Sequence, residues 1–141
     1  MEELTKLRQY IETEHYDNAL ILIGEMEEMS KEDKLNKIYS YGVILLIHLI
    51  KQAAEERTTR SWEFSIYNAT KEIKRANKRR KSGGVYADAI ELREILTDAF
   101  DTAIKKAALE AFEGQYSEAE LEAQIDREEI LAKAFEQIRG D

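Results

Sequence analysis

LNKIYSYGVILLIHLIKQ, at residues 35–52, contains the most apolar segment of this chain. From Gly42 to Ile50 the segment is apolar on every side and is interrupted only by His48. A helix that is hydrophobic all round lies either at the centre of its own domain or in a membrane. Crossing a bilayer takes about 20 apolar residues. This shorter run therefore predicts the central helix of an all-α bundle.

Composition supports one helical domain. The chain has 141 residues, no proline and no cysteine, so it lacks the strongest helix breaker and can form neither disulfides nor thiolate metal sites. We expect a single domain over residues 1–141, with a core bundle over about 1–114 and a helical tail over about 117–141. The first residues, MEELTKLRQ, do not resemble a signal peptide, which predicts a cytoplasmic protein.

Helical periodicity predicts an up-down bundle of four long helices with a short N-terminal helix before them. The short helix covers residues 3–13. Ser30 and Asp33 approximate a capping box, which predicts that a new helix starts there. The four long helices are then expected at 18–29, at 31–55, at 60–81 and from residue 85 or 86 to 112.

Spacing within these segments also predicts packing and helix ends. A narrow seam with steps of three and four residues contains Trp62, Ile66, Ala69, Ile73 and Ala76. Gly42, inside a helix, indicates that a neighbouring element packs closely there. In the tail, Ser117 with Glu120 forms a capping box and Asp126 is a good N-cap. The apolar face of the tail must be covered by the same bundle or by a second chain.

Several motifs resemble a known bacterial family. IGEMEEMSKEDK at 23–34, LLIHLIKQ at 45–52, TRSWEFSI at 59–66 and LTDAFDTAI at 96–104 are similar, in order and spacing, to the bacterial domain-of-unknown-function family numbered twenty-nine. Gln52 stands where that family usually has tryptophan, and the family's prolines are missing. The resemblance implies a small all-α bundle without an established activity. The polar positions that match its pattern are Glu25, Glu27, Glu28, His48, Lys51, Arg60, Ser61 and Trp62.

One polar cluster is a candidate site, and it comprises Glu25, Glu28, His48, Lys51, Arg60 and Trp62. If the helices that contain Glu25 and His48 pack antiparallel, two carboxylates and an imidazole could bind a divalent metal. The Glu-x-x-His spacing of di-metal bundles does not occur, so the alternative is a core histidine bonded to a neighbouring group. Trp62 with Arg60 either anchors the entry of a helix or stacks on a ligand. The sequence predicts no bound metal and no cofactor.

Charge is unevenly distributed along the chain. The net charge is −8, yet residues 57–81 contain nine Lys or Arg against two Glu. The candidate basic patch comprises Lys71, Lys74, Arg75, Lys78, Arg79, Arg80 and Lys81. Cations near a helix C-terminus interact favourably with the helix macrodipole. A solvated helix end is therefore one explanation of this patch. An acidic protein or a nucleic acid is the other, although no aromatic residue interleaves these cations.

Arg8 and His15 have a spacing similar to the phosphate-binding pair of helical bundle ribonucleases from toxin systems. Two residues make a short motif, and here they lie at the first helix instead of late in the bundle. No P-loop, dinucleotide fingerprint or nucleophile elbow is present. The sequence therefore predicts a non-catalytic interaction or assembly module, with a homodimer through the tail as one form. Binding of nucleic acid or an acidic partner is the alternative, and a metal or ribonuclease-like site is a weaker one.

Overall fold

The computed structural model describes residues 2–79 and 83–140, without the side chains of residues 28 and 29. The fold is all-α: 83% of the structure is helical, and the described residues contain no strand. In chain order the elements are α1 (Glu2–Glu12), α2 (Tyr16–Glu55), α3 (Arg60–Asn77), α4 (Ala89–Glu110), the 3₁₀ turn η1 (Ala111–Gly114), α5 (Glu118–Glu122) and α6 (Arg127–Arg139).

The chain divides into two compact units, Met1–Lys34 and Leu35–Asp141. Helix α2 contributes residues to both units. The first unit therefore contains α1 and the first part of α2, whereas the second contains the rest of α2 and all later helices. The single-domain organisation predicted from length stays a prediction.

The predicted helix break at Ser30 is wrong, because α2 continues through it. A capping box needs a Glu or Gln side chain three residues after the cap to reach back to its N–H, and here the shorter Asp33 occupies that position. Lys31 and Glu32 are good helix formers, and neither glycine nor proline lies near them. Helix propagation therefore prevails over the weak start signal.

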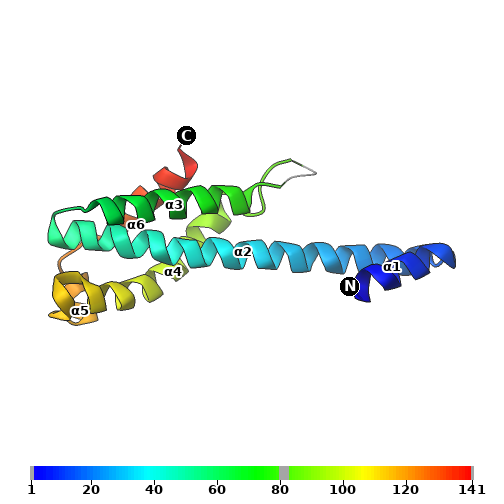
Figure 1. Ribbon diagram of the computed structural model, residues 1–141, viewed down its shortest axis with the longest axis horizontal. Coiled ribbons are helices and arrows are strands. Elements are labelled where there is room, and N and C mark those ends of the chain that lie inside the picture. The colour runs from blue at the N-terminus through cyan, green and yellow to red at the C-terminus, as the bar shows by residue number, and fades with distance from the viewer. Residues whose placement is uncertain (1, 80–82, 141) are drawn as a thin grey trace. The chain divides into compact units, whose positions relative to one another are not determined.

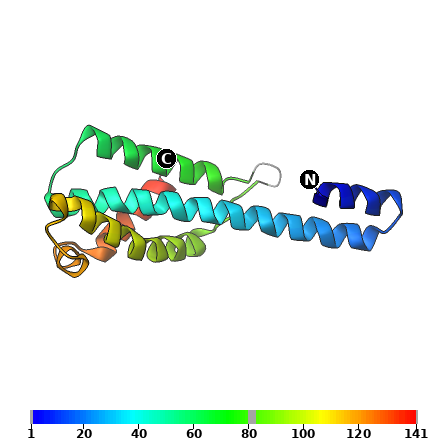
Figure 2. The same cartoon turned by 60° about the horizontal axis from the view of Figure 1, so that its bottom comes forward.

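The core of the second unit forms around the apolar segment of α2. Helices α3 and α4 flank the C-terminal half of α2 (Figure 1), and Figure 2 shows the same arrangement after rotation. Ile38, Leu45, Leu46 and Ile50 are fully buried. The predicted seam of α3 is confirmed, since all five of its residues are buried on the inner side of that helix. The apolar stripe along α3 explains why this side of the helix packs into the core.

Close packing at Gly42 is also confirmed. A Cβ atom built on Gly42 would lie 3.3 Å from Cδ2 of Leu96 and 3.8 Å from Cβ of Ala99, both on α4. The Tyr39 hydroxyl and the Thr102 Oγ1 are 2.7 Å apart, which adds a polar contact between the same helices. The absence of a side chain at Gly42 thus allows α2 and α4 to approach closely.

The connection from α3 to α4 is held by backbone hydrogen bonds. Lys78 and Val85 form an isolated antiparallel bridge, and Arg79 N donates to Gly84 O at 3.1 Å. Helix α4 starts at Ala89 with Asp88 as its N-cap, later than the predicted start at residue 85 or 86. Residues 85–87 are used in contacts to the end of α3 and so cannot join the helix.

The tail folds back on its own chain. Phe112, Glu113 and Gly114 have φ values of 51°, 57° and 78°, so the chain turns sharply after α4. The predicted capping box at Ser117 and the cap at Asp126 are both confirmed. Helix α6 contacts α3 and α4 and buries an apolar row that comprises Ile130, Ala134, Phe135 and Ile138. The tail's apolar face is therefore covered within the same chain.

The first unit buries little apolar surface. Among its described side chains only Ala19 is buried, and α1 contains no buried residue. Its exposed large apolar side chains are Leu4, Ile11, Tyr16, Leu20, Ile21 and Ile23.

Candidate functional site

Trp62, on the first turn of α3, lies next to two cations, Lys51 and Arg57, and we call these three residues the Trp62 cluster. Its backbone N–H donates to the Thr59 hydroxyl at 3.0 Å, which caps the helix. Lys51 Nζ and Arg57 Cζ each lie 4.7 Å from the centre of the indole ring, within the distance for a cation–π interaction. Lys51 Nζ also lies 3.1 Å from Oε1 of Glu110, at the end of α4. These contacts join α2, α3 and α4.

Glu55 connects the Trp62 cluster to the turn after α4. One carboxylate oxygen lies 3.0 Å from Arg57 Nε, and the other accepts from the backbone N–H of Phe112 at 3.4 Å. Trp62 is only 9% exposed, so the ring has little free face for a ligand. The arrangement fits the helix-anchoring interpretation of Trp62. Sequence reasoning did not pair Glu110 with Trp62, because no local spacing links residues so distant in the chain. Arg57 is near Trp62 in sequence but lies in the connection between α2 and α3, whose conformation helical spacing does not predict.

The predicted polar cluster is only partly brought together. Lys51 and Trp62 are in contact, whereas Arg60 is exposed at the start of α3. His48 is half-buried, and its Nδ1 lies 2.8 Å from the carbonyl oxygen of Ile44 in the same helix. Glu25 is exposed in the first unit, and the Glu28 side chain lies outside the described residues.

The metal hypothesis assumed a turn at Ser30 that would allow Glu25 and His48 to approach. That turn is absent, since one helix contains both residues. Among the described residues, no group of three or more His, Cys, Asp or Glu side chains could hold a metal ion. The metal site, a weaker alternative from the sequence, therefore lacks the turn on which it depended.

Arg8 and His15 each have a local partner. Arg8 Nε lies 3.4 Å from Oε1 of Glu12, one turn along α1, and both side chains are exposed. His15 Nδ1 lies 2.7 Å from the Thr13 hydroxyl in the turn before α2. These contacts are the ordinary ones of a helix surface and a turn.

The basic patch follows the end of α3. Its described members are Lys71, Lys74, Arg75, Lys78 and Arg79, all exposed, whereas Arg80 and Lys81 lie outside the described residues. Lys74 Nζ donates to the Gly140 carbonyl oxygen, and Arg75 lies 3.9 Å from Glu72.

Arg79 is also in the patch, and its Cζ lies 5.5 Å from the centre of the Tyr86 ring. Several of the patch's cations are thus already engaged within the chain.

Exposed aromatic side chains extend this patch toward the start of the helix. Phe64 and Tyr67 are 66% and 62% exposed, and their ring centres are 6.5 Å apart. Spacings of three and four residues place side chains on one side of a helix. By this spacing, the surface that we call the α3 outer face comprises Arg60, Phe64, Tyr67, Lys71, Lys74, Arg75 and Lys78.

Sequence reasoning missed the aromatic part of this face because it considered only residues 71–81 as the patch. The signal was present in the steps from 64 to 67, 71 and 74, which continue the same helical row. The face lies opposite the buried seam of α3. It therefore combines apolar rings at one end with cations at the other.

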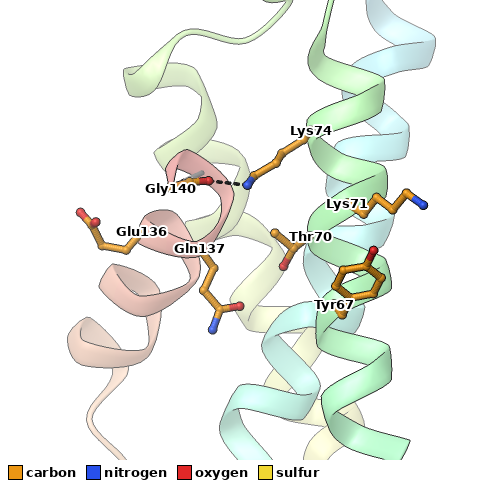
Figure 3. Close-up of a pocket in the computed structure, with 7 residues that line it drawn as sticks. All are labelled: Tyr67, Thr70, Lys71, Lys74, Glu136, Gln137 and Gly140. Carbon is orange, nitrogen blue, oxygen red and sulfur yellow. Dashed lines mark hydrogen bonds between the residues drawn. The ribbon is translucent and has the colours of Figure 1, made fainter.

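A groove of about 570 Å³ runs along one edge of this face, between α3 and α6, and its lining comprises Tyr67, Thr70, Lys71, Lys74, Glu136, Gln137 and Gly140 (Figure 3). Lys74 reaches across to Gly140, whereas Lys71 extends away from α6. Thr70 Oγ1 is buried and has no hydrogen-bond partner among the described residues. A buried hydroxyl without a partner is unfavourable by about 1–3 kcal/mol.

Comparison with known proteins identifies a family but no characterised relative. Residues 2–136 match the family model described as "Domain of unknown function DUF29". No curated protein and no solved structure matches the chain. Separately, none of the described helices has the length and apolar character needed to span a membrane.

Proposed function

This chain belongs to the DUF29 family, a domain of unknown function, and we propose from its geometry that it is a non-catalytic helical interaction module. It binds an acidic protein surface through the α3 outer face. The observation that carries this proposal is the row of exposed aromatic and cationic side chains on one side of α3. A cytoplasmic location is part of the proposal, and the cysteine-free, acidic sequence supports it.

The aromatic end of the face supplies apolar contact area. Removing apolar surface from water favours association by about 25 cal/mol per Å² before the entropy cost of association is subtracted. Phe64 and Tyr67 are large, adjacent and mostly exposed. Aromatic residues are enriched among the side chains that dominate binding energy in protein interfaces. A partner that covers both rings would therefore bind more tightly than a partner that contacts only the cations.

The cationic end favours acidic partners. Lys71 and Lys78 are exposed, one on the turn after Tyr67 and the other at the end of α3. Opposite charges across an interface guide the approach of the partner and fix its register. Together the two ends match an amphipathic acidic helix, which presents apolar side chains beside carboxylates.

The same observations favour protein over nucleic acid. Polyanion binding depends on many cations that each neutralise a phosphate. Lys74, Arg75 and Arg79 already have partners within the chain, which leaves few cations on this face for phosphates. Exposed rings also stack on bases, so a nucleic-acid oligomer is the comparison that decides between the two classes of partner.

The proposal can be tested with designed peptides and the full chain. One labelled helical peptide has leucine at spacings of three and four residues and glutamate elsewhere, and a second has lysine in place of glutamate. An oligouridylate of about 20 nucleotides tests the nucleic-acid alternative. We expect the acidic peptide to bind and its affinity to fall as salt rises.

Variants identify the surface. Phe64→Ala with Tyr67→Ala, and separately Lys71→Glu, should each weaken binding of the acidic peptide about tenfold or more. Leu109→Ala and Lys106→Glu, at exposed positions on α4, are the matched controls. Failure of the monomeric chain to bind the acidic peptide, equal loss in the controls, or tighter binding of the oligouridylate would each overturn the proposal.

A further inference from the structure

We propose that the acidic partner of the α3 outer face is the first unit of a second copy of this chain. This inference rests on the function proposed above and identifies its ligand. The first unit, residues 1–34, would dock on α3 of the other copy. The exposed apolar side chains of this unit, its charge and the spacing of one of its helical rows support this docking.

The first unit has apolar surface to cover. It is a pair of helices in which only Ala19 is buried among the described side chains. Units of fewer than about 40 residues generally need disulfides, metals or association to be stable, and the chain has no cysteine. Leu20 and Ile23, which are 67% and 37% exposed, lie one turn apart on α2. Association would remove both from water.

Charge decides which surface this unit prefers. Residues 1–34 contain ten Asp or Glu and four Lys or Arg, a net charge of −6. Two first units placed against each other would repel, because like charges across an interface oppose association. The α3 outer face is basic and also carries exposed apolar rings. It is therefore complementary to the first unit in both charge and hydrophobicity.

The spacing of the two rows also matches. On α2, Leu20 and Ile23 are followed by Glu27, with steps of three and four residues, and all three are exposed. On α3, Phe64 and Tyr67 are followed by Lys71 with the same steps. A parallel pair of helices in this register would place apolar side chains against rings at two positions. At the third position it would place the Glu27 carboxylate against the Lys71 ammonium.

Two copies can satisfy this contact reciprocally. The first unit of each copy would dock on α3 of the other, so that the same contact forms twice in a closed dimer. The dimer differs from one built through the tail, whose apolar row on α6 is already buried within its own chain. The assembly should weaken as salt rises, because part of the contact is electrostatic.

Light scattering on the full chain, over a range of concentrations at low and high salt, tests the assembly. We expect a mass of two chains that falls toward one chain at high salt. Glu27→Lys and Lys71→Glu should each weaken the dimer about tenfold or more. An equimolar mixture of the two variants, and a chain that carries both changes, should recover the mass of two chains, since both then restore opposite charges.

Glu25→Lys is the matched control. It makes the same charge change two residues away, which on a helix is another side, and it should leave the dimer within about twofold of the parent chain. Circular dichroism of each variant checks that the helices are retained. A dimer that neither Glu27→Lys nor Lys71→Glu weakens would overturn the inference, as would a loss that the mixed variants do not restore.

The acidic peptide separates this inference from the proposed function. A chain that stays monomeric but binds the peptide through α3 overturns the second-copy inference and leaves the proposed function intact. A monomeric chain that binds the peptide only after Glu27→Lys indicates docking within one chain, which also overturns it. A monomeric chain that never binds the peptide overturns both proposals.

Discussion

The side-chain amide of Asn77 holds the backbone of Ala87 by two hydrogen bonds. Asn77 Oδ1 accepts from Ala87 N at 2.7 Å, and Asn77 Nδ2 donates to Ala87 O at 3.1 Å. Asn77 is 8% exposed and Ala87 is 2% exposed. The pair therefore fixes the end of α3 to the residue that precedes the N-cap of α4.

Asn77→Ala should destabilise the protein by roughly 2–4 kcal/mol. The change leaves a buried N–H and a buried carbonyl without their partners, and each such loss costs about 1–3 kcal/mol. Urea denaturation followed by circular dichroism measures the effect. Asn36→Ala, at an exposed position on α2, is the control and should change stability by less than about 0.5 kcal/mol. Equal effects of the two changes would refute the assigned role of Asn77.

Lys51→Met should lower the free energy of unfolding less than Lys51→Ala does, and the difference between the two variants should be about 1–2 kcal/mol. The Lys51 side chain is 10% exposed and lies over Trp62, so its aliphatic stem contributes packing that methionine retains and alanine loses. Thermal unfolding ranks the two variants. The emission of Trp62, the chain's one tryptophan, reports whether the ring stays buried. Equal losses for the two variants would show that the charge, which both changes remove, and not packing dominates this contact.

Substitution at Gly42 should depend steeply on size. In Gly42→Ala the new methyl is tight only against the movable end of Leu96, at 3.3 Å, and makes an ordinary contact with Ala99 Cβ at 3.8 Å, while alanine gains about 1 kcal/mol in helix propensity. We expect a net change within about 1 kcal/mol of the parent chain. Gly42→Leu adds atoms that the α2–α4 contact cannot accommodate and should cost about 3 kcal/mol or more. A well-tolerated Gly42→Leu would contradict the close approach of the two helices.

The capping box of α5 should contribute to acid sensitivity. Hydrogen bonds from the Ser117 backbone and side chain lower the pKa of Glu120 below its usual 4.5. A carboxyl whose pKa is lowered by folding adds stability above its unfolded pKa, and this stability is lost as pH falls through the folded value. Glu120→Gln should therefore flatten the decline of stability below about pH 4.5. Urea midpoints measured over the acid range check this. Glu113→Gln is the control, and an equal flattening there would refute the assignment.

The helices and their buried faces were largely predictable from sequence. The steps of three and four residues through Trp62, Ile66 and Ile73 fix one face of α3, and burial confirms them. The caps at Ser117 and Asp126 were predictable because each side chain bonds to a backbone group only a few residues away, so the sequence alone shows both partners. Local signals of this kind depend little on the rest of the fold.

The break predicted at Ser30 and the late start of α4 show where local signals fail. At Ser30 a weak cap competes with strong helix formers on both sides. Before α4, Ala87 is bound by Asn77, ten residues earlier, and this contact prevails over helix propensity. The Trp62 cluster likewise includes a contact from Lys51 to Glu110, which lies far along the chain. Such contacts depend on tertiary packing, which residue spacing does not encode.

The position of α6 has a consequence for synthesis on the ribosome. Phe135 and Ile138 complete the apolar interior formed with α3 and α4, yet they are translated after both of those helices. Proteins are made from the N-terminus at about 5–20 residues per second, so α3 and α4 emerge before their covering helix. The nascent chain should therefore expose this seam for a few seconds, and chaperones that recognise apolar segments could bind it in that interval.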